Sequence, residues 1–255
     1  MAKIKVAVIG AGMMGKNHLK TYKSLPNVEL VGVYDIFPEA AQKAAETFGV
    51  KVFSSMEEVA EKVDAVSVVT TSVTHADVGE FFLNKGIHCM MEKPLATSEE
   101  GCRRLINAAK KNNVVLLVGH IERFNPAVEQ MGKILSDTSK IRSLTAQRMS
   151  AASGRITDVD VAMDLMIHDV EVIQSLVRSP VINVQAAAVK TSDHPEGKDY
   201  ITAVLEFANG RQHYRQPHYP GPGTHPDGYH RHQLYRHGLH QPEHQRTFAG
   251  PHAVC

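Results

Sequence analysis

Lys3-Ile-Lys-Val-Ala-Val-Ile-Gly-Ala-Gly-Met-Met-Gly15 is the stretch that decides the fold. Its apolar half predicts a buried strand at residues 3–9, and its glycines have the spacing of a dinucleotide-binding loop. Such glycines allow a tight turn, a close approach of the backbone to pyrophosphate, and close packing of the following helix, whose free N–H groups point at phosphate. The alternative is an ordinary strand–turn–helix corner. We expect the ligand to contact Gly10, Gly12, Met13, Met14 and Gly15.

An acidic residue, Asp35, follows Gly15 by twenty positions and ends a second strand-like run at residues 29–34. A carboxylate in that place accepts hydrogen bonds from the adenosine ribose and repels a 2′-phosphate. The next residues, 36–38, are Ile, Phe and Pro and supply no cation for such a phosphate. The pattern therefore favours NAD over NADP, with a solvated turn acid as the alternative.

The first 119 residues alternate strand-like and helix-like segments. Further apolar runs lie at residues 65–70, 87–91 and 114–118, with amphipathic stretches at 13–24, 38–48, 75–84 and 98–112. Strands that are apolar on both faces and separated by helices indicate a parallel sheet covered on both sides. We therefore predict an α/β fold in which residues 1–119 form a Rossmann doubly wound parallel sheet that binds NAD.

After Gly119 the predicted strands neighbour one another. A helix at 126–136, a strand at 142–149, a helix at 161–177 and strands at 181–190 and 200–207 are expected. This order predicts a smaller α+β domain over residues 120–210 with an open sheet. That sheet should be incomplete, because the hairpin signal Asn209-Gly210 leads into no recognisable partner strand.

The composition changes from Arg211 onward. Residues 211–255 hold nine of the fifteen histidines and six of the twelve prolines, and few aliphatic residues. Such a segment buries too little apolar surface to offset its ordering entropy, so we expect an irregular tail. Codons for residues 211–220 shifted by one base permit Gly-Ser-Ile-Ile-Ala-Ser-Arg-Ile-Thr, a plausible strand. We hypothesise that the tail is a frame-shifted sequence; the alternative is a metal-binding tail, which the irregular histidine spacing disfavours.

Composition also excludes several functions. The net charge of +1 argues against a nucleic-acid or membrane-surface binder, and no apolar run reaches the roughly 18 residues of a spanning helix. Cys89, Cys102 and Cys255 are scattered and form no metal or disulfide pattern, which fits a reducing cytosol. The chain enters its first strand at once, so we expect a cytoplasmic protein without a signal peptide and without a metal.

Polar residues follow two of the predicted strands. Thr70, Thr71 and His75 come after the run at 65–70 and could line the cofactor, although Thr74 could equally cap the next helix. Glu92 and Lys93 follow the run at 87–91 and are also expected to contact the cofactor. A cation there, beside the expected nicotinamide, could polarise a hydroxyl or carbonyl oxygen, whereas Glu-Lys-Pro elsewhere is an ordinary turn.

The predicted helix 161–177 is apolar nearly all round and is crossed by one polar stripe, made by Asp164, His168, Glu171 and Ser175 at spacings of four, three and four. A histidine in a cleft is a candidate general base, and Asp164 could orient it. The alternative is a surface His–Asp pair. Arg123 and Asn125, in the segment joining the domains, could bind substrate or only satisfy backbone groups there.

In combination these motifs resemble the Gfo/Idh/MocA family of nicotinamide-dependent sugar and cyclitol oxidoreductases, over roughly residues 3–209. The resemblance rests on the glycine loop, Asp35, Glu92-Lys93-Pro94 and Asp164-x-x-x-His168 in the family's order. It implies an enzyme that oxidises a sugar, most similar to members acting on sugar nucleotides. His168 would be the base, Lys93 the electrostatic partner of the reacting oxygen and Asp164 their support.

The resemblance further implies that residues 120–210 bind substrate and form subunit contacts in a homo-oligomer, which the altered C-terminus puts in question. Lys93, Arg123, Asn125, Asp164 and His168 are the expected substrate contacts. The alternative function is a non-catalytic NAD-binding regulator, or an inactive truncated member of the same family.

Overall fold

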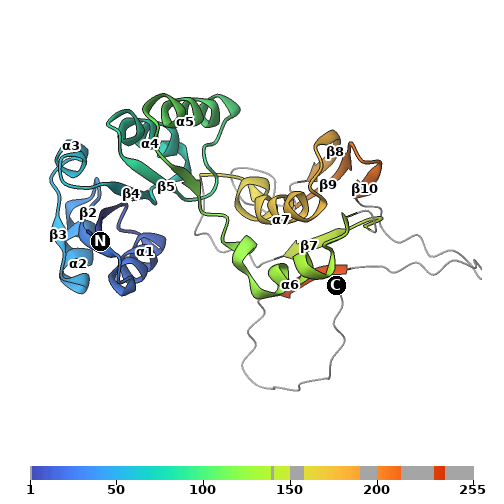
Figure 1. The fold of residues 1–255 in the computed structure, drawn as a ribbon, viewed down its shortest axis with the longest axis horizontal. Helices are drawn as coiled ribbons and strands as arrows, with labels where there is room; N and C mark the ends of the chain where they lie inside the picture. Colours follow the sequence, from blue (N-terminus) through green and yellow to red (C-terminus); the bar gives the residue numbers. More distant parts are fainter. Residues whose placement is uncertain (1, 139–140, 150–157, 190–199, 214–232, 239–255) are drawn as a thin grey trace, which may run out of the picture. The chain divides into compact units, whose positions relative to one another are not determined.

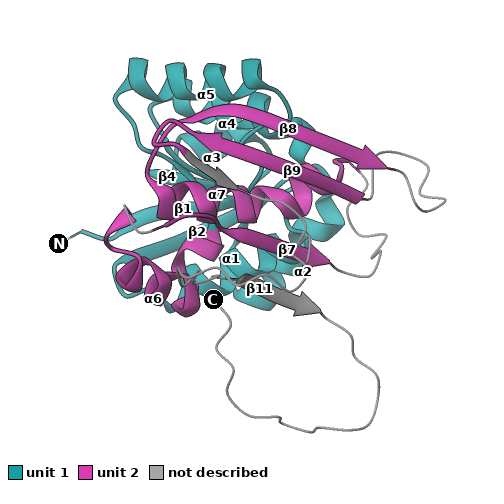
Figure 2. Cartoon of the chain, turned by 90° about the vertical axis from the view of Figure 1, so that its right-hand side faces the viewer, with its two compact units in different colours: residues 1–120 teal, residues 121–255 magenta. Residues whose placement is uncertain are grey.

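The structure is a computed structural model that describes residues 2–138, 141–149, 158–189, 200–213 and 233–238. The chain divides into two compact units, residues 1–120 and 121–255, which Figure 2 colours separately. The functions predicted for these parts of the chain stay predictions.

The first unit contains a parallel sheet. Within residues 2–138 six strands pair in the order β3-β2-β1-β4-β5-β6. They are β1 (Ile4–Ile9), β2 (Val28–Tyr34), β3 (Lys51–Val52), β4 (Ala65–Val68), β5 (His88–Met91) and β6 (Leu116–Val118). The strand order reverses at β1 and β4, and ligands of doubly wound sheets bind at the carboxyl ends of the strands at such a point. The predicted Rossmann fold is confirmed.

Helices cover both faces of this sheet (Figure 1). On one face α1 (Met13–Ser24) and α2 (Pro38–Phe48) pack with Val8 of β1. On the other, α4 (His75–Asn84) and α5 (Glu99–Asn112) share a core with Ala7 and Ile9. Successive residues of β1 thus face opposite sides, as the pleat of a strand requires, and all three are buried.

Three short elements of this unit were not predicted: β3, α3 (Met56–Ala60) and the 3-10 turn η1 (Ser72–Thr74). Each is too short to give a hydrophobic period in the sequence. Ser55 caps α3 by accepting a hydrogen bond from the backbone N–H of Glu58, which is why so short a helix begins there.

The second unit packs helices against short sheets. Its elements are η2 (Ile121–Phe124), α6 (Pro126–Ile134), β7 (Thr145–Met149), η4 (Ala162–Met166), α7 (Ile167–Val177), β8 (Val181–Val189) and β9 (Tyr200–Phe207). Its core gathers Val128 and Met131 of α6, Ile173 and Leu176 of α7, and Phe207 of β9. The antiparallel pair β8–β9 fits the predicted α+β domain.

The predicted helix 161–177 differs from expectation in its first turn. Residues 162–166 form one turn of π-helix, which carries Asp164, and α-helical geometry begins at Ile167. Only one face of α7 is buried, through Val172, Ile173, Leu176 and Val177. The wider turn therefore alters the spacing on which the predicted polar stripe was based.

The tail also departs from expectation where it is described. Arg211–His213 forms β10, which continues the hairpin through Gly210 and pairs antiparallel with β9. Gln233–Gly238 forms β11, which pairs parallel with β7. The expectation of an irregular tail without a partner strand after Gly210 is wrong for these segments. Residues 214–232 and 239–255, with most of its histidines, lie outside the described residues.

Candidate active site

The glycine loop lies between β1 and α1, at the carboxyl end of the central strand. Gly10 has φ +105°, and a Cβ on it would lie 2.5 Å from the carbonyl oxygen of Val69. A Cβ on Gly15 would lie 1.9 Å from the carbonyl oxygen of Gly10. A Cβ on Gly12 would meet nothing within 4 Å. The protein itself thus requires Gly10 and Gly15, whereas the space beside Gly12 is open to a ligand.

Asp35 links the glycine loop to the end of β2. Its Oδ2 accepts a hydrogen bond of 2.6 Å from the backbone N–H of Ala11, and its Oδ1 accepts one of 2.9 Å from Phe37. The carboxylate therefore holds the loop in place, a role that the sequence did not suggest. Its expected contact with a ribose stays a prediction.

Large apolar side chains near these strand ends are exposed. Met13 is 60% exposed, Ile36 74%, Phe37 67% and Val73 57%. Exposed apolar groups gathered around a polar loop are typical of a ligand surface. Sequence reasoning used Ile36 and Phe37 only as evidence against a cation, although an apolar pair in a turn was itself a signal.

Thr70, Thr71 and His75 bind to the protein itself. The hydroxyl of Thr74 lies 2.8 Å from both Thr70 Oγ1 and the carbonyl oxygen of Thr71, and it does not cap α4. His75 is 1% exposed, with Nδ1 2.7 Å from the carbonyl oxygen of Pro94 and Nε2 3.2 Å from that of Thr70. This arrangement favours a packing role for His75 over the cofactor contact expected from the sequence.

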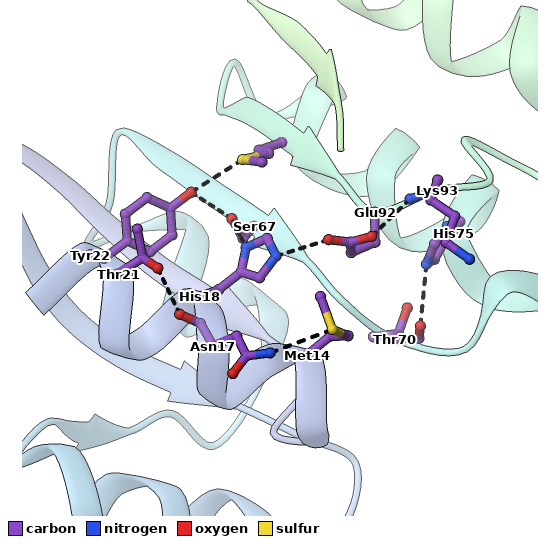
Figure 3. Close-up of polar contacts among 11 residues, drawn as sticks. Met14, Asn17, His18, Thr21, Tyr22, Ser67, Thr70, His75, Glu92 and Lys93 are labelled. Carbon is purple, nitrogen blue, oxygen red and sulfur yellow. Dashed lines mark hydrogen bonds and ion pairs between the residues drawn. The ribbon is translucent and has the colours of Figure 1, made fainter. Parts of the chain in front are cut away.

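Glu92 lies directly beyond β5, beside Lys93, and is only 8% exposed. Its Oε1 is 3.0 Å from His18 Nε2, and its Oε2 accepts a hydrogen bond of 3.1 Å from the backbone N–H of Lys93 (Figure 3). Burial alone would raise the pKa of Glu92. The hydrogen bond and charge of His18, with those of Lys93, outweigh burial and hold that pKa below its ordinary value.

His18 belongs to a set of polar side chains that sequence reasoning missed. Its Nδ1 lies 3.1 Å from Ser67 Oγ, which lies 2.6 Å from the hydroxyl of Tyr22. Burial raises the pKa of Tyr22 and outweighs the opposing hydrogen bond from Ser67. Two signals were present: Ser67 is a polar residue inside the apolar run of β4, and His18 and Tyr22 are four residues apart on one helix face.

The second unit holds the other predicted catalytic residues, Asp164 and His168, on consecutive helical elements. Both are partly buried. Glu122 in η2 interacts electrostatically with His168. Burial would raise the pKa of Glu122, but a hydrogen bond from Asn125 and the charges of Arg148 and His168 lower it.

Arg148 joins these elements and was not predicted. Its guanidinium donates hydrogen bonds of 3.0 to 3.2 Å to the carboxylate of Asp169 and lies 3.4 Å from Glu122 Oε1. Burial would lower its pKa, but these two carboxylates raise it. Arg148 therefore ties η2 and β7 to the first turn of α7.

Arg123 and Asn125 also contact the protein. Arg123 forms an ion pair of 2.7 Å with Glu171. Asn125 caps α6 by accepting a hydrogen bond of 3.0 Å from Ala127, and it donates one of 3.1 Å to Glu122. For Asn125 this favours the alternative of a local backbone partner. The expected substrate contacts of both residues stay predictions.

Comparison with known proteins matches two family models to the chain. One, described as an oxidoreductase family with an NAD-binding Rossmann fold, covers residues 4–120. The other, the C-terminal domain of the same family, covers residues 131–214. The chain belongs to the Gfo/Idh/MocA family. Its first unit is the family's NAD-binding Rossmann domain, and the expected resemblance is confirmed.

Individual Gfo/Idh/MocA relatives agree. A UDP-N-acetylglucosamine 3-dehydrogenase from Acidithiobacillus ferrooxidans is 33% identical over 210 residues, or 82% of this chain and 65% of the relative. Its solved structure has a TM-score of 0.76 and matches 84% of this chain and 69% of that one. An inositol 2-dehydrogenase from Rhizobium meliloti is 28% identical over 222 residues, or 82% of this chain and 67% of the relative.

A further solved structure is GenD2 from gentamicin A biosynthesis in complex with NAD. It is 25% identical, has a TM-score of 0.74 and matches 84% of this chain and 65% of its own. The chain therefore spans about two thirds of the length of these relatives. Among the described residues no group of three His, Cys, Asp or Glu side chains could hold a metal ion, and no helix there is long and apolar enough to cross a membrane.

Proposed function

We propose that this chain is an NAD-dependent dehydrogenase that transfers hydride between the hydroxyl-bearing carbon of a sugar and nicotinamide. One observation carries the proposal: Lys93 follows β5 in a turn that is anchored on both sides, by Glu92 and through Pro94 by His75. β5 pairs with β4, whose carboxyl end meets the glycine loop at Val69. These contacts support a role for Lys93 at the carboxyl ends of the strands, the edge at which doubly wound sheets bind nucleotides.

The cofactor residues fit NAD. Gly12 leaves room for pyrophosphate, α1 directs its N-terminus there, and Asp35, directly after β2, is followed in the sequence by Ile, Phe and Pro and not by a cation. The exposed side chains of Ile36 and Phe37 suit the flat face of an adenine. When bound, NAD supplies the hydride acceptor, and the protein positions it.

The side chains must accept the proton of the substrate hydroxyl. Oxidation of an alcohol needs a base for the hydroxyl proton as hydride leaves, and we assign this role to His168, oriented by Asp164. Lys93 stabilises the negative charge that develops on the oxygen. A sugar nucleotide is the substrate class we favour, because the similar UDP-N-acetylglucosamine 3-dehydrogenase reaches 33% identity.

The test combines a binding measurement with an activity screen. NAD affinity is measured by calorimetry, and nicotinamide absorbance is followed with UDP-sugars, free sugars and inositols. For Lys93→Met and His168→Gln we expect kcat/KM to fall about 10²- to 10⁴-fold. NAD affinity of His168→Gln should match that of the parent protein, because the residue acts on substrate.

Lys110→Met is the matched control, because Lys110 is exposed at the end of α5. It should retain full turnover. Near-normal turnover of both site variants would refute the assigned roles. NAD binding without turnover on any substrate in the screen would replace the proposal with the non-catalytic regulator.

A further inference from the structure

Four buried or partly buried polar side chains form a continuous hydrogen-bonded chain in the first unit. It runs from Tyr22 of α1 to Ser67 of β4, from Ser67 back to His18 of α1, and from His18 to Glu92 beyond β5 (Figure 3). Ser67 is fully buried, and the side chains of His18 and Glu92 are each 11% exposed. Polar groups removed from water destabilise a fold unless they are paired, so the completeness of this chain is informative.

The hydrogen-bond directions follow from the ends of the chain. Glu92, as a carboxylate, only accepts, so His18 Nε2 must carry a hydrogen and donate it. With a neutral ring, Nδ1 accepts from the Ser67 hydroxyl, which in turn accepts from Tyr22. With a protonated ring these two bonds reverse, and the Tyr22 hydroxyl can donate to Met90 Sδ at 3.6 Å. In both states His18 donates to Glu92.

Hydrogen-bond donors lie beside both oxygens of Glu92, which favours its ionised form. Its second oxygen accepts from the backbone N–H of Lys93. A Cβ at Gly119 would lie 3.2 Å from Oε1, the oxygen that faces His18, so a side chain there would crowd the carboxylate. The titratable groups that face the carboxylate are His18, with Tyr22 behind it, from α1, and the adjacent Lys93.

The same turn is held from the opposite side. His75, buried in α4, bonds through Nδ1 to the carbonyl oxygen of Pro94 at 2.7 Å. Lys93 therefore lies between two residues whose positions are fixed by histidines of two different helices. Of these two residues, Glu92 is the one that accepts a hydrogen bond from the peptide N–H of Lys93 itself.

We propose that His18 is a positioning residue, which fixes Glu92 and through it the peptide that presents the Lys93 amine to the reacting oxygen. This inference rests on the proposed dehydrogenase function. Because the ring of His18 is hydrogen-bonded to Ser67 and Glu92, we assign it a role that acts through Glu92 and not on substrate. The chain from Tyr22 through Ser67 sets the orientation of the His18 ring.

The decisive comparison is among substitutions of His18. His18→Phe removes both hydrogen bonds, whereas His18→Gln keeps a donor at the reach of Nε2. For His18→Phe we expect kcat to fall about ten- to a hundredfold, as for a catalytic group displaced by roughly 1 Å, with NAD affinity retained. His18→Gln should recover most of this loss. Thr21→Ala is the matched control, because it changes an exposed residue of the same helix.

Two readouts separate positioning from a general packing defect. The acid limb of the kcat–pH profile should move to higher pH in His18→Phe, because Glu92 loses the partner that favours its ionised form. Glu92→Gln should remove the effect of a subsequent His18→Phe change, since the two residues act in series.

A third readout does not depend on turnover. Hydrogen exchange of the Lys93 amide should accelerate in His18→Phe and stay slow in His18→Gln and Thr21→Ala. Unchanged exchange and unchanged kcat in His18→Phe would overturn the inference. If the parent protein shows no turnover, the proposed function fails, while the exchange rates still decide the role of His18. Should His18→Phe not fold, His18→Asn, which reaches Ser67 but not Glu92, takes its place with the same expected outcomes.

Discussion

Gly12 and Gly15 belong to one loop and one motif, yet their surroundings differ. A Cβ on Gly15 would collide with the backbone of Gly10, whereas the side of Gly12 is open and its φ of −64° suits any residue. Gly15 therefore serves the fold, and Gly12 leaves space for a ligand. Single glycine-to-alanine substitutions, each adding one methyl group, can therefore separate the two functions.

For Gly15→Ala we expect a loss of about 2 kcal/mol or more in the free energy of unfolding, because backbone must move to admit the methyl group. Gly12→Ala should cost about 1 kcal/mol or less, since only the N-terminal cap of α1 changes. Its NAD affinity should nevertheless fall at least about tenfold, because the methyl group occupies the space of the pyrophosphate. Denaturation with and without NAD measures both; equal effects of Gly12→Ala and Gly15→Ala on stability would contradict this account.

At this scale the sequence predicted where polar groups lie but not what they bind. The positions of Asp35 and Glu92 follow from the ends of strands. Their partners do not, because Glu92 meets His18 across 74 residues of sequence and a hydrogen bond carries no local periodic signal. Short-range bonds, such as the capping of α6 by Asn125, were within reach of sequence rules.

At the scale of elements, long periodic segments were predicted well and departures from regular geometry were not. Bounds of α1, α2, α4 and β9 agree with the expected ranges. The π-helical turn at 162–166 was not expected, because the apolar pattern of that segment continues without a break. Such turns occur often at functional sites, and here one carries Asp164.

Arg148 provides a test of how the second unit holds its helices. Arg148→Met should lower the free energy of unfolding by about 1–3 kcal/mol, because Asp169 and Glu122 keep partly buried carboxylates without their cation. Arg103→Met is the control: Arg103 pairs with Glu99 on the exposed face of α5, and a loss of about 0.5 kcal/mol or less is expected. Urea denaturation of both variants decides.

The cluster of Glu122, Arg148 and Asp169 also predicts how the stability of the protein changes with pH. Because the pKa of Glu122 is held below its ordinary value, its contribution to stability is present at neutral pH and is lost as pH falls through the carboxyl range. Arg148→Met should weaken that dependence. Equal losses for Arg148→Met and Arg103→Met at neutral pH would show that the cluster contributes nothing beyond a surface pair.

At the scale of the whole molecule, fold class and family followed from the order of motifs. The sequence could not reveal β11, because its pairing with β7 joins segments separated by nearly ninety residues. Its composition pointed away from any strand. The pairing of β10 with β9 is local and begins at Gly210, whose φ of +76° suits the turn.

The unusual composition of residues 211–255 leads to an expectation about the gene. If the tail is a frame-shifted sequence, the coding DNA read one base later from codon 211 should encode apolar strands without early stop codons. Sequencing the DNA settles this directly. A polar or interrupted alternative frame would rule the hypothesis out and leave the histidine-rich tail as a native feature.

Among the described residues each hydrophobic core cluster lies within one unit: two in residues 1–120 and one in residues 121–255. A substitution within one of these clusters therefore acts first on the packing of its own unit. Over evolutionary time, the part that holds the nucleotide can stay constant while its companion diversifies. Relatives named for inositol, apiose and UDP-N-acetylglucosamine, at 25% to 33% identity to this chain, are the proteins in which this expectation can be examined.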